Sequence, residues 1–261
     1  MAHIIEIDHL ADAALSVYTS LTQPQQREKG LFIAESVNVI SHALDAGYEP
    51  VSFLLSKKHA FGKAASLLAR AGDIPAYVAE EEALEKITGY ALTRGVLCAM
   101  RRKPFPDAEN ICRDARIVCA IHAVTDATNV GAIIRSAAAL GGDCVLLSNC
   151  CDPFSRRSVR VSMGTVFQVP IAQIHGDCAE FLRKMGFATA ALALTDDSVP
   201  PNDPRLKSEE KIALILGAEG DGLPQEIVEK CDYRVKIPMA RGVDSLNVAA
   251  AAAVALYAIR E

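Results

Sequence analysis

The sequence predicts two α/β domains joined by a short linker. Apolar stretches of strand length alternate with segments of helical period along most of the chain, which is typical of this class. Residues 101–107 interrupt the pattern, because they carry three basic residues and two prolines without periodicity. We therefore expect a first domain over residues 1–104, a linker over 105–115 and a second domain over 116–261.

The first domain is expected to be a small α/β sandwich. Helical patterns cover residues 36–46, 61–71 and 80–87. Short apolar strands are predicted over residues 51–55, 76–78 and 96–100. Because the helical patterns alternate with the strands, the helices can pack against a single small sheet.

The second domain is expected to contain a parallel sheet. Strands are predicted over residues 117–121, 144–147, 166–169, 189–194, 212–216 and 233–237. Helical patterns lie over residues 132–140, 178–185, 224–230 and 247–259. Near-continuous apolar strands separated by helices indicate a parallel sheet that is covered on both faces. Ligands of such sheets bind beyond the carboxyl ends of the strands.

The composition indicates a folded, soluble protein. Of the 261 residues, 51% are hydrophobic and 23% are charged. No apolar run reaches the roughly 20 residues of a membrane span, and residues 1–10 lack the basic start of a secretory signal. We therefore expect a cytoplasmic location. The net charge of −5 argues against binding nucleic acid by bulk charge, so any RNA-binding basic residues must gather on one face.

The eight cysteines and six histidines show no metal-binding pattern. No CxxC pair occurs, and the only adjacent pair, Cys150-Cys151, consists of neighbours that rarely form a disulfide. We interpret the cysteines as buried or half-buried thiols in a reducing cytoplasm. The spacing of cysteines and histidines predicts that the protein has no metal site.

Three segments of the second domain each end a strand, turn and enter a helix. The first is residues 129–131 with Arg135, which helical spacing is expected to direct back toward the same corner. The second is residues 217–224, where three glycines within six residues permit a sharp turn and close approach to a ligand. The third runs from residues 237–239 to residues 245–247 at the start of the last helix. We expect these three corners to line one pocket.

Each corner also has a plain structural interpretation. Asn129, Ser245 or Asn247 can simply cap a helix, and Arg135 can be a solvated or paired surface residue. Residues 217–224 can be an ordinary loop, because their spacing matches neither the GxGxxG dinucleotide fingerprint nor a phosphate-binding P-loop. The three corners taken together favour a ligand site more than any one of them does alone.

An ordered set of motifs connects these corners with a known family. The motifs are Asn129-x-Gly131-x3-Arg135, Gly217-x-Glu219-Gly220-x-Gly222 and Ile237-Pro238-Met239 followed by Ser245-Leu246-Asn247-Val248. Together they resemble the three motifs of the SpoU/TrmH family, which are RNA 2′-O-ribose methyltransferases of the SPOUT class. The resemblance covers residues 117–261.

This resemblance implies a fold, an activity and a partner. The fold is a SPOUT-type α/β domain with a C-terminal trefoil knot, an exception to the rule that protein chains are unknotted. The activity is methylation of a ribose 2′-hydroxyl with S-adenosylmethionine as the donor, without a metal. The partner is RNA, and the protein is expected to be a homodimer whose paired knot regions complete the site.

Roles for single residues follow from the resemblance. The catalytic residues that it implies are Arg135, Asn129, Glu219, Ser245 and Asn247. The cofactor-binding residues that it implies are Gly217, Ile237, Leu246, Gly220 and Met239. An arginine side chain holds its proton tightly and is a poor base. Either Arg135 loses its proton transiently, or it stays charged, binds a phosphate and stabilises the developing alkoxide. Energetics favour the second interpretation.

A basic run over residues 156–160 is similar to a family segment near the active site. Helical spacing places its arginines on neighbouring positions of one face. We interpret Arg157 and Arg160 as RNA phosphate contacts, although a solvated helix face is the plain alternative.

The N-terminal part also has a counterpart. Residues 26–35 and 84–96 are similar to the RNA-binding domain, akin to small ribosomal proteins, that often precedes SpoU catalytic domains. Its usual glycine is Ser36 here, and Ala127 and Arg241 depart from the family pattern in the second domain. This domain favours 23S-type ribosomal RNA as the substrate. Transfer RNA, methylation of a base, and a non-catalytic RNA-binding protein on the same scaffold remain alternatives.

Overall fold

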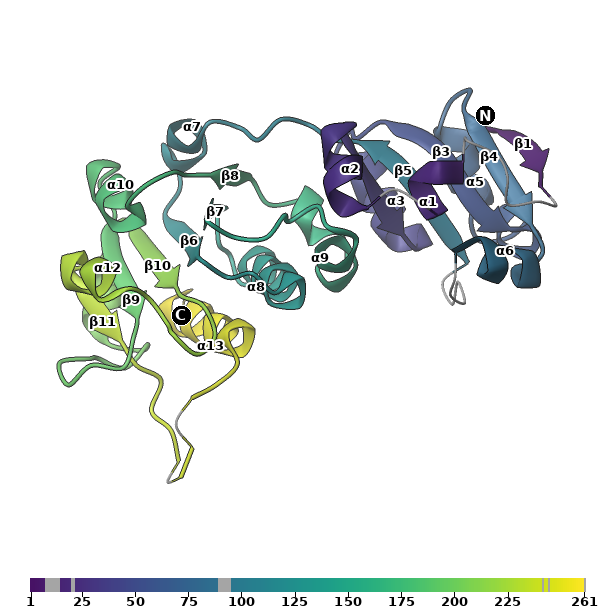
Figure 1. Cartoon of the computed structure of the whole chain (residues 1–261). Coiled ribbons are helices and arrows are strands. Elements are labelled where there is room, and N and C mark those ends of the chain that lie inside the picture. The colour runs from purple at the N-terminus through teal and green to yellow at the C-terminus, as the bar shows by residue number, and fades with distance from the viewer. Residues whose placement is uncertain (8–14, 20–21, 89–94, 241, 244, 261) are drawn as a thin grey trace. The chain divides into compact units, whose positions relative to one another are not determined.

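The chain forms two units, each built around one β-sheet (Figure 1). A computed structural model describes residues 1–7, 15–19, 22–88, 95–240, 242–243 and 245–260. The first unit comprises residues 1–104 and 154–167, and the second comprises residues 105–153 and 168–261. The first unit therefore includes a segment from the middle of the chain. A functional division into residues 1–104, 105–115 and 116–261 stays a prediction.

The first unit has a mixed five-stranded sheet in the order β1-β4-β3-β5-β2. The strands are β1 (His3–Glu6), β2 (Leu31–Glu35), β3 (Pro50–Ser56), β4 (Pro75–Ala79) and β5 (Val96–Arg101). The parallel pairs are β1 with β4 and β3 with β4, whereas β5 is antiparallel to both β2 and β3. The three predicted strands are confirmed as β3, β4 and β5. The sequence pattern does not reveal β1 and β2.

Short helices surround this sheet. They are α1 (Ser16–Thr19), α2 (Gln23–Glu28), α3 (Val37–Asp45), α4 (Lys57–Ala60), α5 (Ala65–Arg70), α6 (Glu81–Thr88), α9 (Arg156–Val161) and the 3-10 helix η2 (Thr165–Phe167). The helices predicted over residues 36–46 and 80–87 are confirmed as α3 and α6. The helix predicted over residues 61–71 begins later, at Ala65, because the Ser56 hydroxyl caps the separate short helix α4.

Aromatic rings attach residues 154–167 to the first unit. The ring of Phe32 on β2 lies 5.4 Å from that of Phe154 and 5.5 Å from that of Phe167. The ring of Tyr48 lies 5.0 Å from that of Phe167. The strand predicted over residues 166–169 is wrong: residues 165–167 form η2, and the strand follows Pro170. Phe167, one of the apolar residues that suggested a strand, is instead buried in this aromatic cluster.

The second unit has a six-stranded sheet in which every pair is parallel, in the order β11-β9-β10-β6-β7-β8. The strands are β6 (Ile117–His122), β7 (Cys144–Ser148), β8 (Ile171–Gln173), β9 (Ala188–Leu192), β10 (Ile212–Leu216) and β11 (Tyr233–Val235). The parallel sheet predicted from the apolar strands is confirmed. Leu216 is paired with Ile121, so β10 and β6 end at the same edge.

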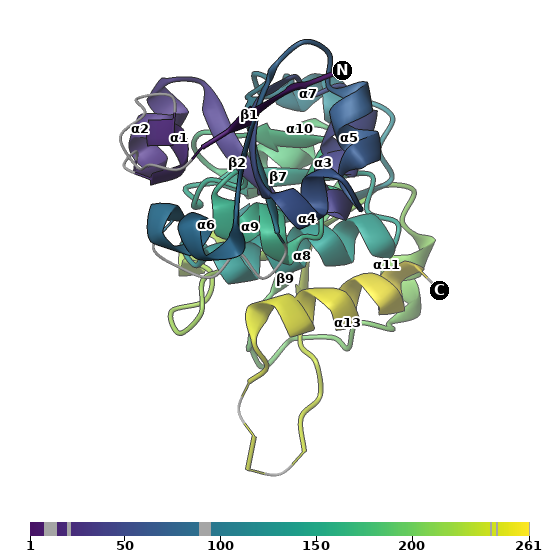
Figure 2. The same ribbon diagram turned by 90° about the vertical axis from the view of Figure 1, so that its right-hand side faces the viewer.

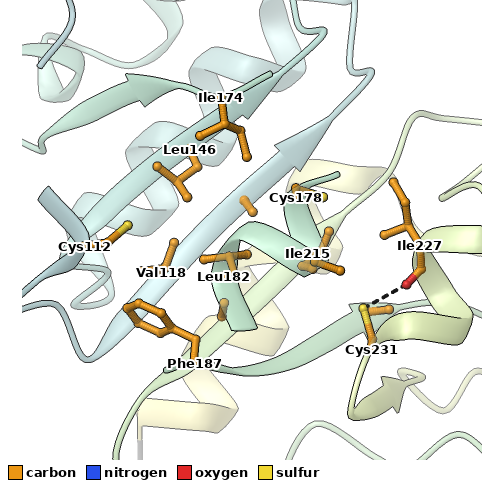
Figure 3. Packing of buried hydrophobic residues seen from close by; sticks show 14 of the residues in the cluster. Cys112, Val118, Leu146, Ile174, Cys178, Leu182, Phe187, Ile215, Ile227 and Cys231 are labelled. Atoms are coloured by element: carbon orange, nitrogen blue, oxygen red, sulfur yellow. Dashed lines mark hydrogen bonds between the residues drawn. The ribbon is translucent and has the colours of Figure 1, made fainter. Parts of the chain in front are cut away.

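Helices cover both faces of this sheet. They are α7 (Ala108–Cys112), α8 (Ala127–Ala139), α10 (Cys178–Lys184), α11 (Pro204–Ser208), α12 (Gln225–Lys230) and α13 (Val248–Arg260). One face packs against α7, α10 and α12 in the hydrophobic core shown in Figure 3. On the other face α8 and α13 lie side by side (Figure 2). The knot that the family resemblance implies stays a prediction.

Helix α8 begins earlier than its sequence pattern predicts. The predicted range was 132–140, whereas the helix starts at Ala127. Asp126 is the reason, because its Oδ1 accepts hydrogen bonds from the backbone N–H groups of Thr128 (2.8 Å) and Asn129 (2.9 Å). Ala127 thus occupies the first helical position, where proline is also favoured, so the departure from the family pattern leaves the helix start intact.

Candidate active site

A cavity of about 380 Å³ lies at the carboxyl edge of the second sheet. We call it the corner cavity. It is lined by residues that follow β9 and β10 and by the start of α13: Leu192, Leu194, Leu216, Gly217, Ala218, Glu219, Gly220, Gly222, Ser245, Leu246, Asn247, Val248 and Ala251. Two of the three predicted corners therefore form its wall, at the sheet edge where ligands of parallel sheets bind.

The turn after β10 is too tight for any residue but glycine at its first position. The N–H of Gly222 donates to the carbonyl of Ala218 across the turn (3.1 Å). A Cβ on Gly217 would lie 2.3 Å from the carbonyl carbon of Gly222, well inside van der Waals contact. Gly220 and Gly222 have φ angles of 88° and 69°, which non-glycine residues adopt at a cost. The turn therefore presents backbone to the cavity.

Asn247 connects the three motifs. Its Oδ1 caps α13 by accepting from the N–H groups of Ala249 (3.0 Å) and Ala250 (3.4 Å). Its Nδ2 donates to Oδ1 of Asn129 (3.0 Å) and to the carboxylate of Glu219. Capping and site formation were alternatives for this residue, and its side chain does both. The start of α13, the glycine turn and α8 are thereby held together by one amide.

Asn129 is the buried member of this network. Its side chain is on the first turn of α8 and the residue is only 7% exposed. Its Oδ1 accepts from Asn247, while its Nδ2 has no hydrogen-bond acceptor among the described residues. A buried amide N–H without an acceptor is unfavourable. A bound ligand with an oxygen acceptor would satisfy it.

Arg135 does not line the corner cavity. It lies on the exposed surface of α8, six residues after Asn129. The expectation that helical spacing returns it to the same corner is wrong. Six residues turn a helix by about 240° beyond a full turn and advance it by about 9 Å. Within one chain, Arg135 and the corner cavity are therefore separate features.

The predicted cofactor residues divide into two sets. Gly217, Gly220 and Leu246 line the corner cavity, as does Ser245 from the catalytic set. Ile237 and Met239 are half-buried in the segment after β11 and are not among the lining residues. Arg241, noted for its departure from the family pattern, lies outside the described residues, as do residues 89–94 of the N-terminal motif.

Leu192 and Leu194 are cavity residues that the sequence motifs do not indicate. Leu192 is half-buried and Leu194 is 61% exposed, and both side chains line the cavity. The strand predicted over residues 189–194 contains both, but only the sheet order places β9 beside β10. Only the order of strands in the sheet indicates these two residues, and a single sequence does not give that order.

Arg157 and Arg160 lie on α9 in the first unit, beside α2. Among the described residues, no cluster of three or more histidines, cysteines, aspartates and glutamates could hold a metal ion. Within the same part of the chain, no helix is both long and apolar enough to cross a membrane.

Comparison with known proteins identifies the family. The model of the SpoU rRNA methylase family matches residues 116–257. An uncharacterized tRNA/rRNA methyltransferase of Mycobacterium tuberculosis is 39% identical over 88% of this chain and 80% of its own length. The 23S rRNA (guanosine(2553)-2′-O)-methyltransferase RlmP of Bacillus subtilis is 31% identical over 72% of this chain and 73% of its own length.

A solved structure agrees with this relationship. The AdoMet-bound rRNA methyltransferase of Sinorhizobium meliloti superposes with a TM-score of 0.83 and 27% identity, covering 98% of this chain and 97% of that one. The match therefore includes both units, and the resemblance inferred from the three motifs is confirmed. The chain belongs to the SpoU rRNA methylase family.

Proposed function

We propose that this protein methylates a ribose 2′-hydroxyl of ribosomal RNA, with S-adenosylmethionine as the methyl donor. The observation that carries the proposal is the amide of Asn247, which joins Asn129 and Glu219 at the edge of the corner cavity. The Bacillus subtilis relative is named for this reaction on 23S ribosomal RNA, which supports it. A cytoplasmic location follows, because the proposed substrate and donor are found there.

The corner cavity suits the donor. Its volume of about 380 Å³ is in the range of small-molecule sites, roughly 300–1,000 Å³. Leu192 and Leu194 at the end of β9 and Leu246 just before α13 supply an apolar wall for an adenine ring. The glycine turn supplies backbone groups without side chains in the way. When bound, S-adenosylmethionine supplies a methyl group already activated by its sulfonium, so no metal is required. The Sinorhizobium meliloti structure with AdoMet supports this assignment.

The polar network is suited to holding the ribose. Asn247 is fixed by four hydrogen bonds, two received and two donated. It therefore holds Glu219 and Asn129 in place. The Nδ2 of Asn129, which meets no acceptor within the described part of the chain, can donate to a ribose or phosphate oxygen. Ser245, at the cavity wall, adds a hydroxyl. Fixing both reactants in one geometry is a large part of the catalysis that an activated donor needs.

Arg135 is proposed to stay charged and to stabilise the alkoxide that develops on the ribose. A guanidinium holds its proton tightly, so proton removal from it is unfavourable. A fixed positive charge beside developing negative charge is a common source of rate enhancement. The role requires Arg135 to approach a corner cavity that it does not line in its own chain.

We therefore propose a homodimer in which Arg135 of one chain completes the corner cavity of the other. The exposed face of α13 supports this arrangement. Val254 is 42% exposed and Tyr257 is 52% exposed, so apolar surface is available on the helix that packs beside α8. A second copy of the chain would cover this surface and bring Arg135 with it.

The test is to map the modified nucleoside. Unmodified 23S ribosomal RNA of Bacillus subtilis and bulk transfer RNA, both transcribed in vitro, are incubated with the protein and methyl-labelled S-adenosylmethionine. The RNA is then digested to nucleosides. The proposal predicts label in a 2′-O-methyl nucleoside from the ribosomal RNA. Label in transfer RNA alone would show that transfer RNA is the substrate, and label on a base would show that the enzyme methylates bases. RNA binding without label would indicate a non-catalytic protein.

A further inference from the structure

A second hollow, of about 280 Å³, lies within the first unit. We call it the arginine hollow. It is lined by Gln23 of α2 and by Arg156, Arg157 and Arg160 of α9. These two helices are more than 120 residues apart in sequence and meet only because residues 154–167 pack with the first unit. The basic run over residues 156–160 therefore forms this hollow together with the N-terminal part of the chain.

The arginine hollow has a strongly positive lining. Among the described residues, three of the four that line it are arginines and the fourth is an amide, so none of these four is acidic. Arg157 and Arg160 are exposed to solvent. Arg27 lies one turn after Gln23 on α2, so helical spacing places a further positive charge on the same side of that helix. In a chain with a net charge of −5, such a concentration is local and specific.

Glu35 holds the deepest arginine in place. Its side chain is 5% exposed and accepts hydrogen bonds from Nε (3.2 Å) and Nη2 (2.8 Å) of Arg156. This ion pair, between a buried carboxylate and a half-buried guanidinium, neutralises one charge and fixes the start of α9 against the end of β2. Arg157 and Arg160 are consequently carried on a helix whose position is set by the core of the first unit, including the rings of Phe32 and Phe154.

We propose that the arginine hollow binds the phosphodiester backbone of the RNA substrate. Arginine pairs with phosphate through two parallel N–H donors, and clustered arginines supply the salt-dependent part of nucleic-acid affinity. The hollow has room for more than one phosphate, and Gln23 can donate to a phosphate or a 2′-hydroxyl. The inference rests on the proposed function, since it takes RNA as the ligand. It adds that residues other than those lining the corner cavity bind the RNA backbone.

The experiment measures RNA binding and donor binding separately. The double variant Arg157→Glu/Arg160→Glu is compared with the wild type and with Lys63→Glu, which reverses an exposed charge of the same unit outside the hollow. Affinity for 23S ribosomal RNA of Bacillus subtilis is measured over a series of salt concentrations, and donor affinity by calorimetry with S-adenosylmethionine. Circular dichroism and thermal melting check that each variant is folded.

The double variant is expected to bind the RNA about 10- to 100-fold more weakly, with a shallower dependence of affinity on salt, by about one to two units of slope. Its donor affinity should equal that of the wild type, and Lys63→Glu should change RNA affinity less than about twofold. Equal RNA affinity of the folded double variant and the control would overturn the inference alone. If the wild type bound neither RNA nor donor, the proposed function itself would fail.

Discussion

The corner cavity and the arginine hollow are lined by different kinds of residues. The corner cavity uses a glycine turn, amides and leucines, and its form depends on backbone packed to within a few ångströms. The arginine hollow uses long charged side chains on one short helix. A small, invariant donor can be recognised by fixed backbone, whereas a large polyanion is held by adaptable charges. Substitutions in the two sites should therefore affect different binding steps.

The largest effect on donor binding is expected from Gly217→Ala. The added Cβ would overlap the backbone of Gly222 at 2.3 Å, so the turn must open and the cavity wall must move. We expect loss of donor binding by at least about 100-fold, measured by calorimetry with S-adenosylmethionine, with RNA affinity retained. Gly220→Ala is the matched control, because its Cβ would meet no atom within 4 Å and only its φ of 88° is unfavourable. A donor affinity of Gly217→Ala equal to that of Gly220→Ala would contradict the claim that the tight turn at Gly217 shapes the donor site.

The next effect concerns turnover. Arg135→Lys is expected to lower kcat by about 100-fold or more, since lysine lacks the planar fork, while donor affinity stays unchanged. Near-normal turnover would remove Arg135 from the mechanism.

Mixing Arg135→Ala with Asn247→Ala chains should restore about one quarter of the wild-type rate, because half of randomly formed dimers carry one intact site out of two. No recovery after subunit exchange would contradict the shared site.

Asn247→Ser separates the two roles of Asn247. Serine keeps a hydroxyl that can cap α13, but it cannot reach both Asn129 and Glu219. We expect methylation to fall by about 10- to 100-fold, with thermal stability within about 0.5 kcal/mol of wild type. Asn247→Ala should lose both the activity and about 1 kcal/mol of stability. Equal activity of Asn247→Ser and wild type would leave the residue only its capping role.

The smallest effect is predicted for the first unit, at Ser36. This residue has φ 90° and ψ 151°, a region that essentially only glycine occupies without strain. Ser36→Gly should relieve about 1 kcal/mol of strain and lose a few tenths of a kcal/mol of capping at α3. The melting temperature should therefore rise by a few degrees, with RNA and donor affinity unchanged. A lower melting temperature would show that capping outweighs the strain.

The sequence predicts the second unit better than the first, for physical reasons. The buried strands β6, β7 and β10 are continuous apolar runs with bounds that the pattern nearly matches. Strand β2 is missed because it has only five residues and ends in the charged Glu35, whose side chain is buried by pairing with Arg156, 121 residues away. The strand expected over residues 166–169 is wrong because residues 165–167 form a 3-10 helix and the ring of Phe167 packs in the aromatic cluster rather than in a sheet.

The candidate site, too, is only partly predicted by the sequence. The motifs predict that Gly217, Glu219, Leu246 and Asn247 line one pocket, and the structure brings these residues together. It does not bring Arg135 with them, since the helical turn between it and Asn129 points them to different sides. The grouping of Gln23 with Arg160 depends on a long-range packing that no local periodicity encodes.

Hydrogen exchange with and without saturating S-adenosylmethionine tests the central claim most directly. The backbone amides of residues 217–222 and 245–251 should exchange more slowly when the donor is present, while those of residues 154–167 should be unaffected. Protection confined to other segments, or no protection at any amide, would contradict the assignment of the corner cavity as the donor site.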